Sequence, residues 1–204
     1  MENKPVHIAV FLSGGGSNLQ ALIDGYKAGI LSGKITFVVS NKRKAFGLKR
    51  AEKEQIETAV FKVKDYESDT AAGVDLLEKL EERNIDYIAL AGYLQLLPEL
   101  VVKAYRNRIV NIHPALLPKF GGKGMYGLHV HKAVLEAGET ESGATVHLVD
   151  EFYDNGKILE QMNVNVMKDD TAETLAARVL EKEHKLYPRA LEKLIKGKYE
   201  LKNG

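Results

Sequence analysis

The first 112 residues alternate short apolar runs with amphipathic stretches, and this alternation is the strongest constraint on the fold. Apolar runs rich in β-branched residues occupy positions 6–12, 35–40, 58–63, 87–91 and 109–112. Unbroken runs of this length are typical of strands covered on both faces, as in a parallel sheet. Helix-like stretches lie between them at 18–28, 47–54, 70–83 and 98–105. The third predicts a buried face formed by Val74, Leu77 and Leu80. The pattern predicts an α/β fold, Rossmann-like, with a doubly wound, mostly parallel sheet flanked by helices.

The second half of the chain has a different character. Residues 113–130 are rich in Pro, Gly and His and predict a long loop, and long loops inside a compact domain are usually functional. We expect a helix at 131–137, strands at 143–149 and 157–167 joined by a loop at 150–156, and a last helix at 171–196 interrupted at Pro188. No repeat or linker divides the chain, so we expect one domain over residues 1–204, with halves of about 1–112 and 113–204.

Composition excludes several classes of function. Twenty-nine Lys and Arg against 28 Asp and Glu give a net charge of +1, which is unlike a protein that binds nucleic-acid backbones. The chain has no cysteine, so disulfides, thiolate metal sites and cysteine nucleophiles are excluded. No signal-like start is present and no apolar run approaches ~18 residues, so we expect a cytoplasmic protein without a membrane partner.

A glycine-rich motif follows the first predicted strand, with the sequence Ser-Gly-Gly-Gly-Ser-Asn-Leu at 13–19. The glycines predict a turn, and the next helix is expected to begin with Ser17 or Asn18 as its cap. Free amides at a helix N-terminus bind phosphate. Leu19 replaces the third glycine of the dinucleotide fingerprint, so a mononucleotide phosphate is favoured. A plain capped turn is the alternative.

Asn111 and His113 follow the fifth predicted strand, where ligands of open α/β sheets bind. Strand periodicity places the two side chains on the same side. An amide donor beside an imidazole can stabilise an oxyanion and handle a proton, although both groups could instead satisfy loop backbone. Asp154 could orient the imidazole, near His147, if its loop folds back; alone, its Asp-Asn-Gly sequence is typical of a hairpin turn.

Four histidines raise the question of a metal site. Only His129 and His131 are close in sequence, and neither lies in a metal-binding motif, so we expect no metal. The segment Glu183-His184-Lys185-Leu186-Tyr187-Pro188, taken alone, is typical of a solvated helix with a proline kink.

Taken together, the motifs are more specific than any one of them. The glycine loop, Leu90-Ala91-Gly92-Tyr93, the Asn-Ile-His-Pro-Ala-Leu-Leu-Pro segment from Asn111, Gly-Ala-Thr-Val-His and the Glu183–Pro188 segment occur in this order. This set resembles the phosphoribosylglycinamide formyltransferases, folate-dependent enzymes of purine synthesis, from residue 6 to about 194.

The resemblance implies a reaction and a set of site residues. The donor would be 10-formyltetrahydrofolate, the acceptor would be the amine of glycinamide ribonucleotide, and no metal would take part. Asn111 and His113 would stabilise the oxyanion, and Asp154 would pair with His113 and organise proton transfer. The residues implied for the ribonucleotide are Gly15, Gly16, Ser17, Asn18 and Glu183. Those implied for folate are Tyr93, Leu94, Gln95, Leu96, Leu97, Val102, Ile109, Asn111, Leu148, Val149 and Asp150.

Some residues depart from the family pattern. Gln95 stands where relatives often carry arginine, and Leu180 stands where some carry Lys or Gln. The glycine-rich stretch at 120–127 is longer than in several members, and we hypothesise that it closes over the ribonucleotide. Because a carboxylate favours a charged imidazole, Asp154 is expected to favour the charged form of His113.

Three alternatives are weighed against this reading. Methionyl-tRNA formyltransferase resembles this core but carries a further C-terminal RNA-binding domain, for which 204 residues leave no room. Formyltetrahydrofolate hydrolase resembles it with an extra N-terminal regulatory domain, whereas the catalytic domain is expected here to begin by residue 6. A non-catalytic nucleotide-binding module would use only the glycine loop and would leave Asn111, His113 and Asp154 unexplained. We expect a monomer or a homodimer, with the first half binding the nucleotide and the second carrying the folate and catalytic residues.

Overall fold

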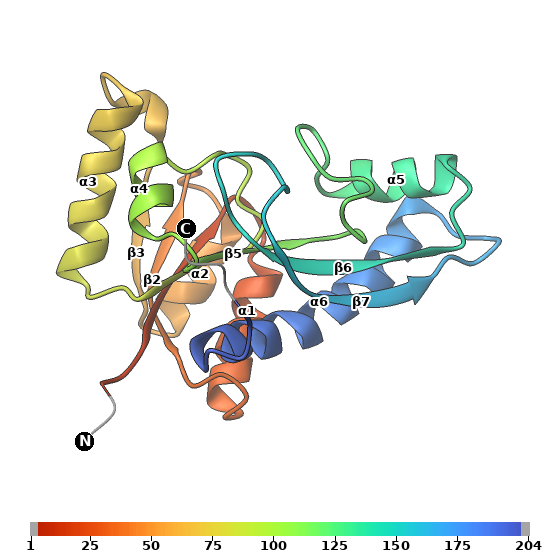
Figure 1. The fold of residues 1–204 in the computed structure, drawn as a ribbon, viewed down its shortest axis with the longest axis horizontal. Coiled ribbons are helices and arrows are strands. Elements are labelled where there is room, and N and C mark those ends of the chain that lie inside the picture. The colour runs from red at the N-terminus through yellow and green to blue at the C-terminus, as the bar shows by residue number, and fades with distance from the viewer. Residues whose placement is uncertain (1–3, 201–204) are drawn as a thin grey trace.

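A central sheet with helices on both faces forms the molecule (Figure 1), and the computed structural model describes residues 4–200. Seven strands occur in the order β3-β2-β1-β4-β5-β6-β7. Their bounds are β1 His7–Leu12, β2 Lys34–Ser40, β3 Glu57–Val60, β4 Tyr87–Leu90, β5 Ile109–His113, β6 Glu141–Leu148 and β7 Ile158–Asn165. Neighbours from β3 to β5 pair in parallel, whereas β6 and β7 are antiparallel. The predicted α/β class and mostly parallel sheet are confirmed.

The helices divide between the two faces of the sheet. Their bounds are α1 Ser17–Lys27, α2 Phe46–Lys53, α3 Asp69–Glu82, α4 Glu99–Ala104, α5 Leu128–Glu136 and α6 Ala172–Ile195, with a short 3-10 turn at Val63–Asp65. Alternate residues of β1 separate two cores. Ile8 and Val10 pack in the core that contains buried residues of α1, α2 and α6, whereas Phe11 packs with those of α3 and α4. Burial on both faces explains why residues 8–12 of β1 are all apolar.

Two details of α3 and β3 differ from the sequence-based prediction. Strand β3 ends at Val60, and Val74 is 47% exposed, so the predicted buried face of α3 is wrong at that position. Leu80 is buried as predicted and Leu77 is half-buried, while Leu76 is buried in place of Val74. The face is turned because α3 packs closely on α4: a Cβ added at Gly73 would lie 3.1 Å from the Cβ of Leu100.

The last helix is continuous through Pro188, so the predicted interruption is wrong. The proline ring packs against α1 at Gly25, where an added Cβ would lie 2.7 Å from the Cβ of Pro188. The neighbouring Tyr187 is fully buried, and its hydroxyl lies 2.9 Å from the carbonyl oxygen of Leu90, at the end of β4. The segment read from sequence as a solvated helix is therefore buried, and it supports the strands that carry the site.

The strand order reverses between β1 and β4, and this is where ligands bind in open α/β sheets. The loops that follow these two strands are joined by Ser13. Its N–H donates to the carbonyl of Gly92 at 3.0 Å, and its Oγ accepts from the N–H of Leu94 at 2.9 Å. Among residues 4–200, no helix is long and apolar enough to cross a membrane.

Candidate active site

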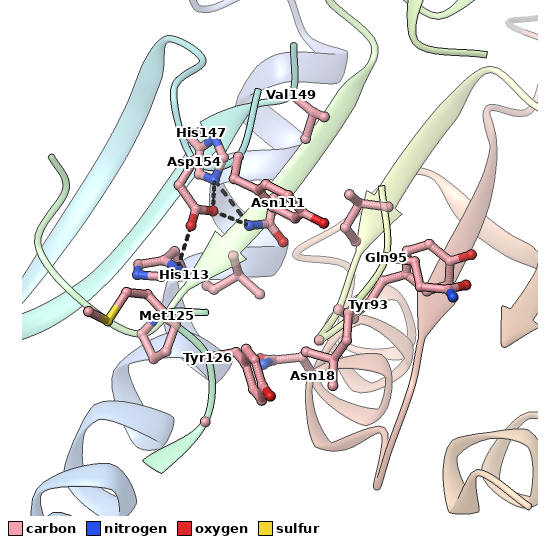
Figure 2. A pocket seen from close by; sticks show the side chains of 18 of the residues that line it. Asn18, Tyr93, Gln95, Asn111, His113, Met125, Tyr126, His147, Val149 and Asp154 are labelled. Atoms are coloured by element: carbon pink, nitrogen blue, oxygen red, sulfur yellow. Dashed lines mark hydrogen bonds and ion pairs between the residues drawn. The ribbon is translucent and has the colours of Figure 1, made fainter. Parts of the chain in front are cut away.

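The centre of the site is built on two paired strands, β5 and β6. Their antiparallel register places Asn111 opposite His147 and His113 opposite Thr145. The Nδ2 atom of Asn111 lies 3.1 Å from Nε2 of His147 (Figure 2). Asn111 and His113, two residues apart on β5, both line the same cavity. The expectation that they point to one side therefore holds.

Asp154 reaches this pair from the loop after β6 (Figure 2). One carboxylate oxygen, Oδ2, lies 3.5 Å from Nδ1 of His113, and the other, Oδ1, lies 3.5 Å from Nε2 of His147. Oδ2 also accepts the N–H of Gly122 at 2.9 Å. The backbone of Asp154 has φ = 52°, a left-handed conformation that Asp and Asn tolerate better than most residues. The carboxylate thus links both histidines with the glycine-rich loop.

The backbone partners of the two imidazoles fix which nitrogens carry protons, because a carbonyl oxygen only accepts. His147 Nδ1–H donates to the carbonyl of Leu148 at 2.8 Å, and Nε2 accepts from Nδ2–H of Asn111. His113 Nε2–H donates to the carbonyl of Phe120, also at 2.8 Å, so Nδ1 faces Asp154. The amide of Asn111 also lies 3.4 Å from Asp154 Oδ1, which is a long contact.

Burial decides the charge of His113. The imidazole is 3% exposed, and burial lowers its pKa below the usual range by more than Asp154 and the Phe120 carbonyl raise it. Asp154 favours the charged form of His113 as expected, but burial outweighs this effect in the free protein. Burial also acts to raise the pKa of Asp154, but its contacts with His147, with His113 and with the N–H of Gly122 leave that pKa lowered. The pair at rest is a neutral imidazole beside a carboxylate.

The glycine loop begins helix α1 without a side-chain cap. Gly16 is the N-cap, with φ = 72°, so the predicted cap at Ser17 or Asn18 is wrong. Asn18 Nδ2 instead donates to the carboxylate of Glu183 at 2.5 Å. Glu183 is buried, which raises its pKa, while the bond from Asn18 acts in the opposite direction. This contact joins α1 to α6 beside the loop.

One cavity of about 970 Å³ joins these groups. Its wall includes all three residues predicted as catalytic and all five predicted for the ribonucleotide. The residues predicted for folate that also line it are Tyr93, Leu94, Gln95, Leu96, Leu97, Val102, Asn111, Val149 and Asp150. Ile109 and Leu148 lie in the two cores and are not part of this wall. Leu148 faces away because it alternates with His147, whereas Ile109 shares the side of Asn111 but lies at the start of β5, in the core with α3 and α4.

The wall predicted for folate carries buried polar atoms that lack partners within residues 4–200. Tyr93 is 8% exposed and its hydroxyl has no partner; burial raises its pKa. The Oε1 atom of Gln95 is also buried without a partner. Leu97 and Val102 are buried beside them. Apolar side chains with a few unpaired polar atoms suit a flat, largely apolar ligand with a polar edge.

Sequence reasoning missed several residues of the wall. Met125 and Tyr126 come from the glycine-rich loop and line the cavity (Figure 2). His131 is 3% exposed, and burial lowers its pKa. The composition of the loop signalled a functional segment but not which side chains turn inward. Among residues 4–200, no group of His, Asp and Glu is arranged to hold a metal ion.

The fold and the site define the class of protein. The family model described as "Formyl transferase" matches residues 6–191, and the chain belongs to this family.

Comparison with individual proteins indicates which members of the family the chain is similar to. The chain is 49% identical over 181 residues to "Phosphoribosylglycinamide formyltransferase, chloroplastic" of Arabidopsis thaliana, covering 88% of this chain and 62% of that protein. It is 38% identical to the "Phosphoribosylglycinamide formyltransferase" of Haemophilus influenzae, with 96% of this chain and 90% of that protein covered. The crystal structure of glycinamide ribonucleotide transformylase 1 from Symbiobacterium toebii superposes with a TM-score of 0.90 at 37% identity, covering 97% and 91% of the two chains.

Proposed function

We propose that this chain transfers the formyl group of 10-formyltetrahydrofolate to the amine of glycinamide ribonucleotide, a step of de novo purine synthesis. The observation that carries the proposal is the cluster of Asn111, His113, Asp154 and His147, linked by contacts of 3.1–3.5 Å on the wall of the cavity. The names of the plant and Haemophilus relatives support the substrates. The absence of cysteine from the sequence suits a reducing compartment, and we propose the cytoplasm.

The ribonucleotide and the folate are assigned to opposite ends of the cavity. Gly15, Gly16, Ser17 and Asn18 supply backbone amides and one side chain to the ribonucleotide, with Glu183 beside them. The segment 93–97 and the loop that contains Val149 and Asp150 form the folate end. The cluster lies on the wall of the same cavity, so the amine and the formyl carbon meet beside it.

In the first step the amine nitrogen attacks the formyl carbon. A C–N bond forms, the carbonyl π electrons move to oxygen, and a tetrahedral oxyanion with a positively charged nitrogen results. Asn111 Nδ2 holds two hydrogens, and the one directed at Asp154 makes a long contact of 3.4 Å. The oxyanion can accept this hydrogen in place of Asp154 Oδ1, which exchanges a weak interaction for a charge-assisted one. The bond to His147 keeps the amide in place during this change.

In the second step the proton leaves the attacking nitrogen and the donor nitrogen departs. Asp154 is ionised in the resting site, so it can accept the proton directly or through one water. The oxyanion electrons then re-form the carbonyl, the bonding pair between the formyl carbon and folate N10 leaves with N10, and N10 takes up the proton that Asp154 accepted, which returns Asp154 to its ionised form. His113 supplies its N–H to the oxyanion once the Phe120 carbonyl is released.

A spectrophotometric assay with a 10-formylfolate donor tests the proposal. We expect release of the deformylated folate only when glycinamide ribonucleotide is present, and loss of this release in Asn111→Ala and His113→Ala proteins that remain folded. Release without the ribonucleotide would instead identify a hydrolase. Nucleotide binding with no turnover under either condition would leave a binding module and refute the transferase.

A further inference from the structure

Helix α2 contacts the glycine loop from the side opposite to the cavity. The N–H of Gly47 donates to the carbonyl of Gly14 at 3.0 Å, and Nε–H of Arg50 donates to the carbonyl of Gly15 at 2.9 Å. The helix comes this close because neither Gly16 of the loop nor Gly47 of α2 has a side chain. A Cβ added at Gly16 would lie 2.6 Å from the Cα of Gly47. Two successive carbonyls of the loop are therefore held by one helix.

These two bonds set the direction of the loop amides. In a planar trans peptide the C=O and the N–H point in opposite directions. Holding the carbonyls of Gly14 and Gly15 against α2 therefore directs the N–H groups of Gly15 and Gly16 away from α2. Within residues 4–200, the cavity wall includes the loop but no residue of α2, and these two N–H groups have no protein acceptor. They are donors left free on the cavity side.

The guanidinium of Arg50 is itself held in place. Nη1 donates to Oε1 of Gln20 on α1 at 3.3 Å, and Cζ lies 5.1 Å from the centre of the Phe46 ring. The planar group reaches the Gly15 carbonyl and α1 at once, which the single ammonium of lysine does not reproduce. Arg50 thus ties the start of α1 to the loop.

The nearby wall supplies little positive charge. Among the lining residues of the described chain, Lys123 is the one Lys or Arg, and the α6 wall presents Ala177 and Leu180. An anion at the loop therefore depends on correctly directed amides. Asn18 adds a separate sign that a ligand binds here: it is 8% exposed, lines the cavity, and its Oδ1 is buried without a partner within residues 4–200.

We infer that Arg50 is a positioning residue for the phosphate of the ribonucleotide, because it aims the Gly16 amide into the cavity, and that Gly47 does the same for the Gly15 amide. This inference rests on the proposed function for its substrate. It assigns Arg50 no direct contact with the phosphate and no part in the chemical step.

Kinetics of two Arg50 variants separate positioning from charge. In Arg50→Ala we expect KM for glycinamide ribonucleotide to rise about tenfold or more, the effect of one misdirected charge-assisted donor, with kcat and KM for the formyl donor within about threefold. Arg50→Lys keeps the positive charge but loses the planar guanidinium that reaches two partners at once, so most of the same rise in KM for the ribonucleotide is expected. Lys49→Ala, which removes the exposed neighbouring charge, is the control and should match the unmodified protein. An Arg50→Lys protein with unchanged KM, or an Arg50→Ala protein in which kcat and both KM values change together, would overturn the inference.

A binding experiment makes the test independent of turnover. Titration of the ¹⁵N-labelled protein with inorganic phosphate should shift the amide resonances of Gly15 and Gly16, and Arg50→Ala should weaken the apparent affinity while leaving the β5 resonances unchanged. If phosphate shifts these resonances and binds Arg50→Ala more weakly, but no formyl transfer occurs, the role of Arg50 is supported and the proposed function is refuted. Equal phosphate affinity in the unmodified protein and Arg50→Ala would refute the role of Arg50, whatever the enzymatic activity.

Discussion

Replacing Asp154 with asparagine removes one negative charge and almost nothing else. Asparagine has the same shape and tolerates the left-handed backbone at this position, where φ is 52°. The amide can still accept the N–H of Gly122 through its oxygen. What is lost is the proton acceptor and the charge that lies 3.5 Å from the imidazole of His113.

The expected size of the effect follows from the loss of the proton acceptor. Because His113 is neutral at rest, the 3.5 Å contact with Asp154 is not an ion pair whose attraction could be added to the effect. Loss of a positioned proton acceptor typically costs about 10²–10⁴ in rate, or roughly 3–5 kcal/mol. We therefore expect kcat to fall by about 10²–10⁴ with little change in either KM.

Steady-state kinetics of the formyl transfer measure this directly, and thermal denaturation verifies the fold. Asp169→Asn is the matched control, because it makes the same substitution at an exposed carboxylate. An NMR titration should also show a further drop in the pKa of His113, since Asp154 is the carboxylate that raises it. A folded Asp154→Asn protein with kcat within tenfold of the unmodified enzyme would refute the assigned role.

Three further predictions concern other parts of the site and the fold. Because burial raises the pKa of Glu183, its contribution to stability is fully present below the unfolded-state value, about 4.3, and is lost as pH rises through the folded value. Glu183→Gln should therefore gain in melting temperature relative to the unmodified protein as pH rises from about 4, and a pH-independent difference would contradict this. Gly25→Ala forces a methyl group to within 2.7 Å of Pro188 and should lower the free energy of unfolding by about 1–3 kcal/mol in urea denaturation; an unchanged midpoint would contradict the close packing. Trypsin cleavage after Lys123 should slow when glycinamide ribonucleotide is bound, and equal cleavage rates with and without it would refute closure of the 120–127 loop.

The sheet could be predicted from sequence because its signal is local. Strands β1, β2, β4 and β5 are short, mostly apolar runs, and each begins and ends within one or two residues of the predicted bounds. The sequence-based predictions for Val74 of α3 and Pro188 of α6 failed because tertiary packing overrides the local preference of the segment. Val74 is exposed because α4 packs on the other side of α3, and Pro188 does not break α6 because Gly25 leaves room for its ring. Neither partner can be identified from the segment itself.

The site was predicted unevenly for a similar reason. Asn111 and His113 share a strand, so periodicity alone relates them. The position of Asp154 depends on the path of a loop, and the contribution of His147 depends on the register between β5 and β6. The sequence indicates the carboxylate partner of His113 but not the burial that outweighs its effect on the pKa of the imidazole. Arg50 went unnoticed because it acts through the backbone and not through a motif of its own.

Ser13 has a consequence for how the two substrates meet. By bonding to both Gly92 and Leu94, it joins the loop proposed to bind the ribonucleotide to the loop proposed to bind folate, at one edge of the sheet. The spacing between the acceptor amine and the formyl donor is then a property of the sheet and does not depend on the closing of one domain upon another. A substrate analogue with a longer or shorter reach would be rejected by this fixed spacing, even where each of its ends fits its own half of the cavity.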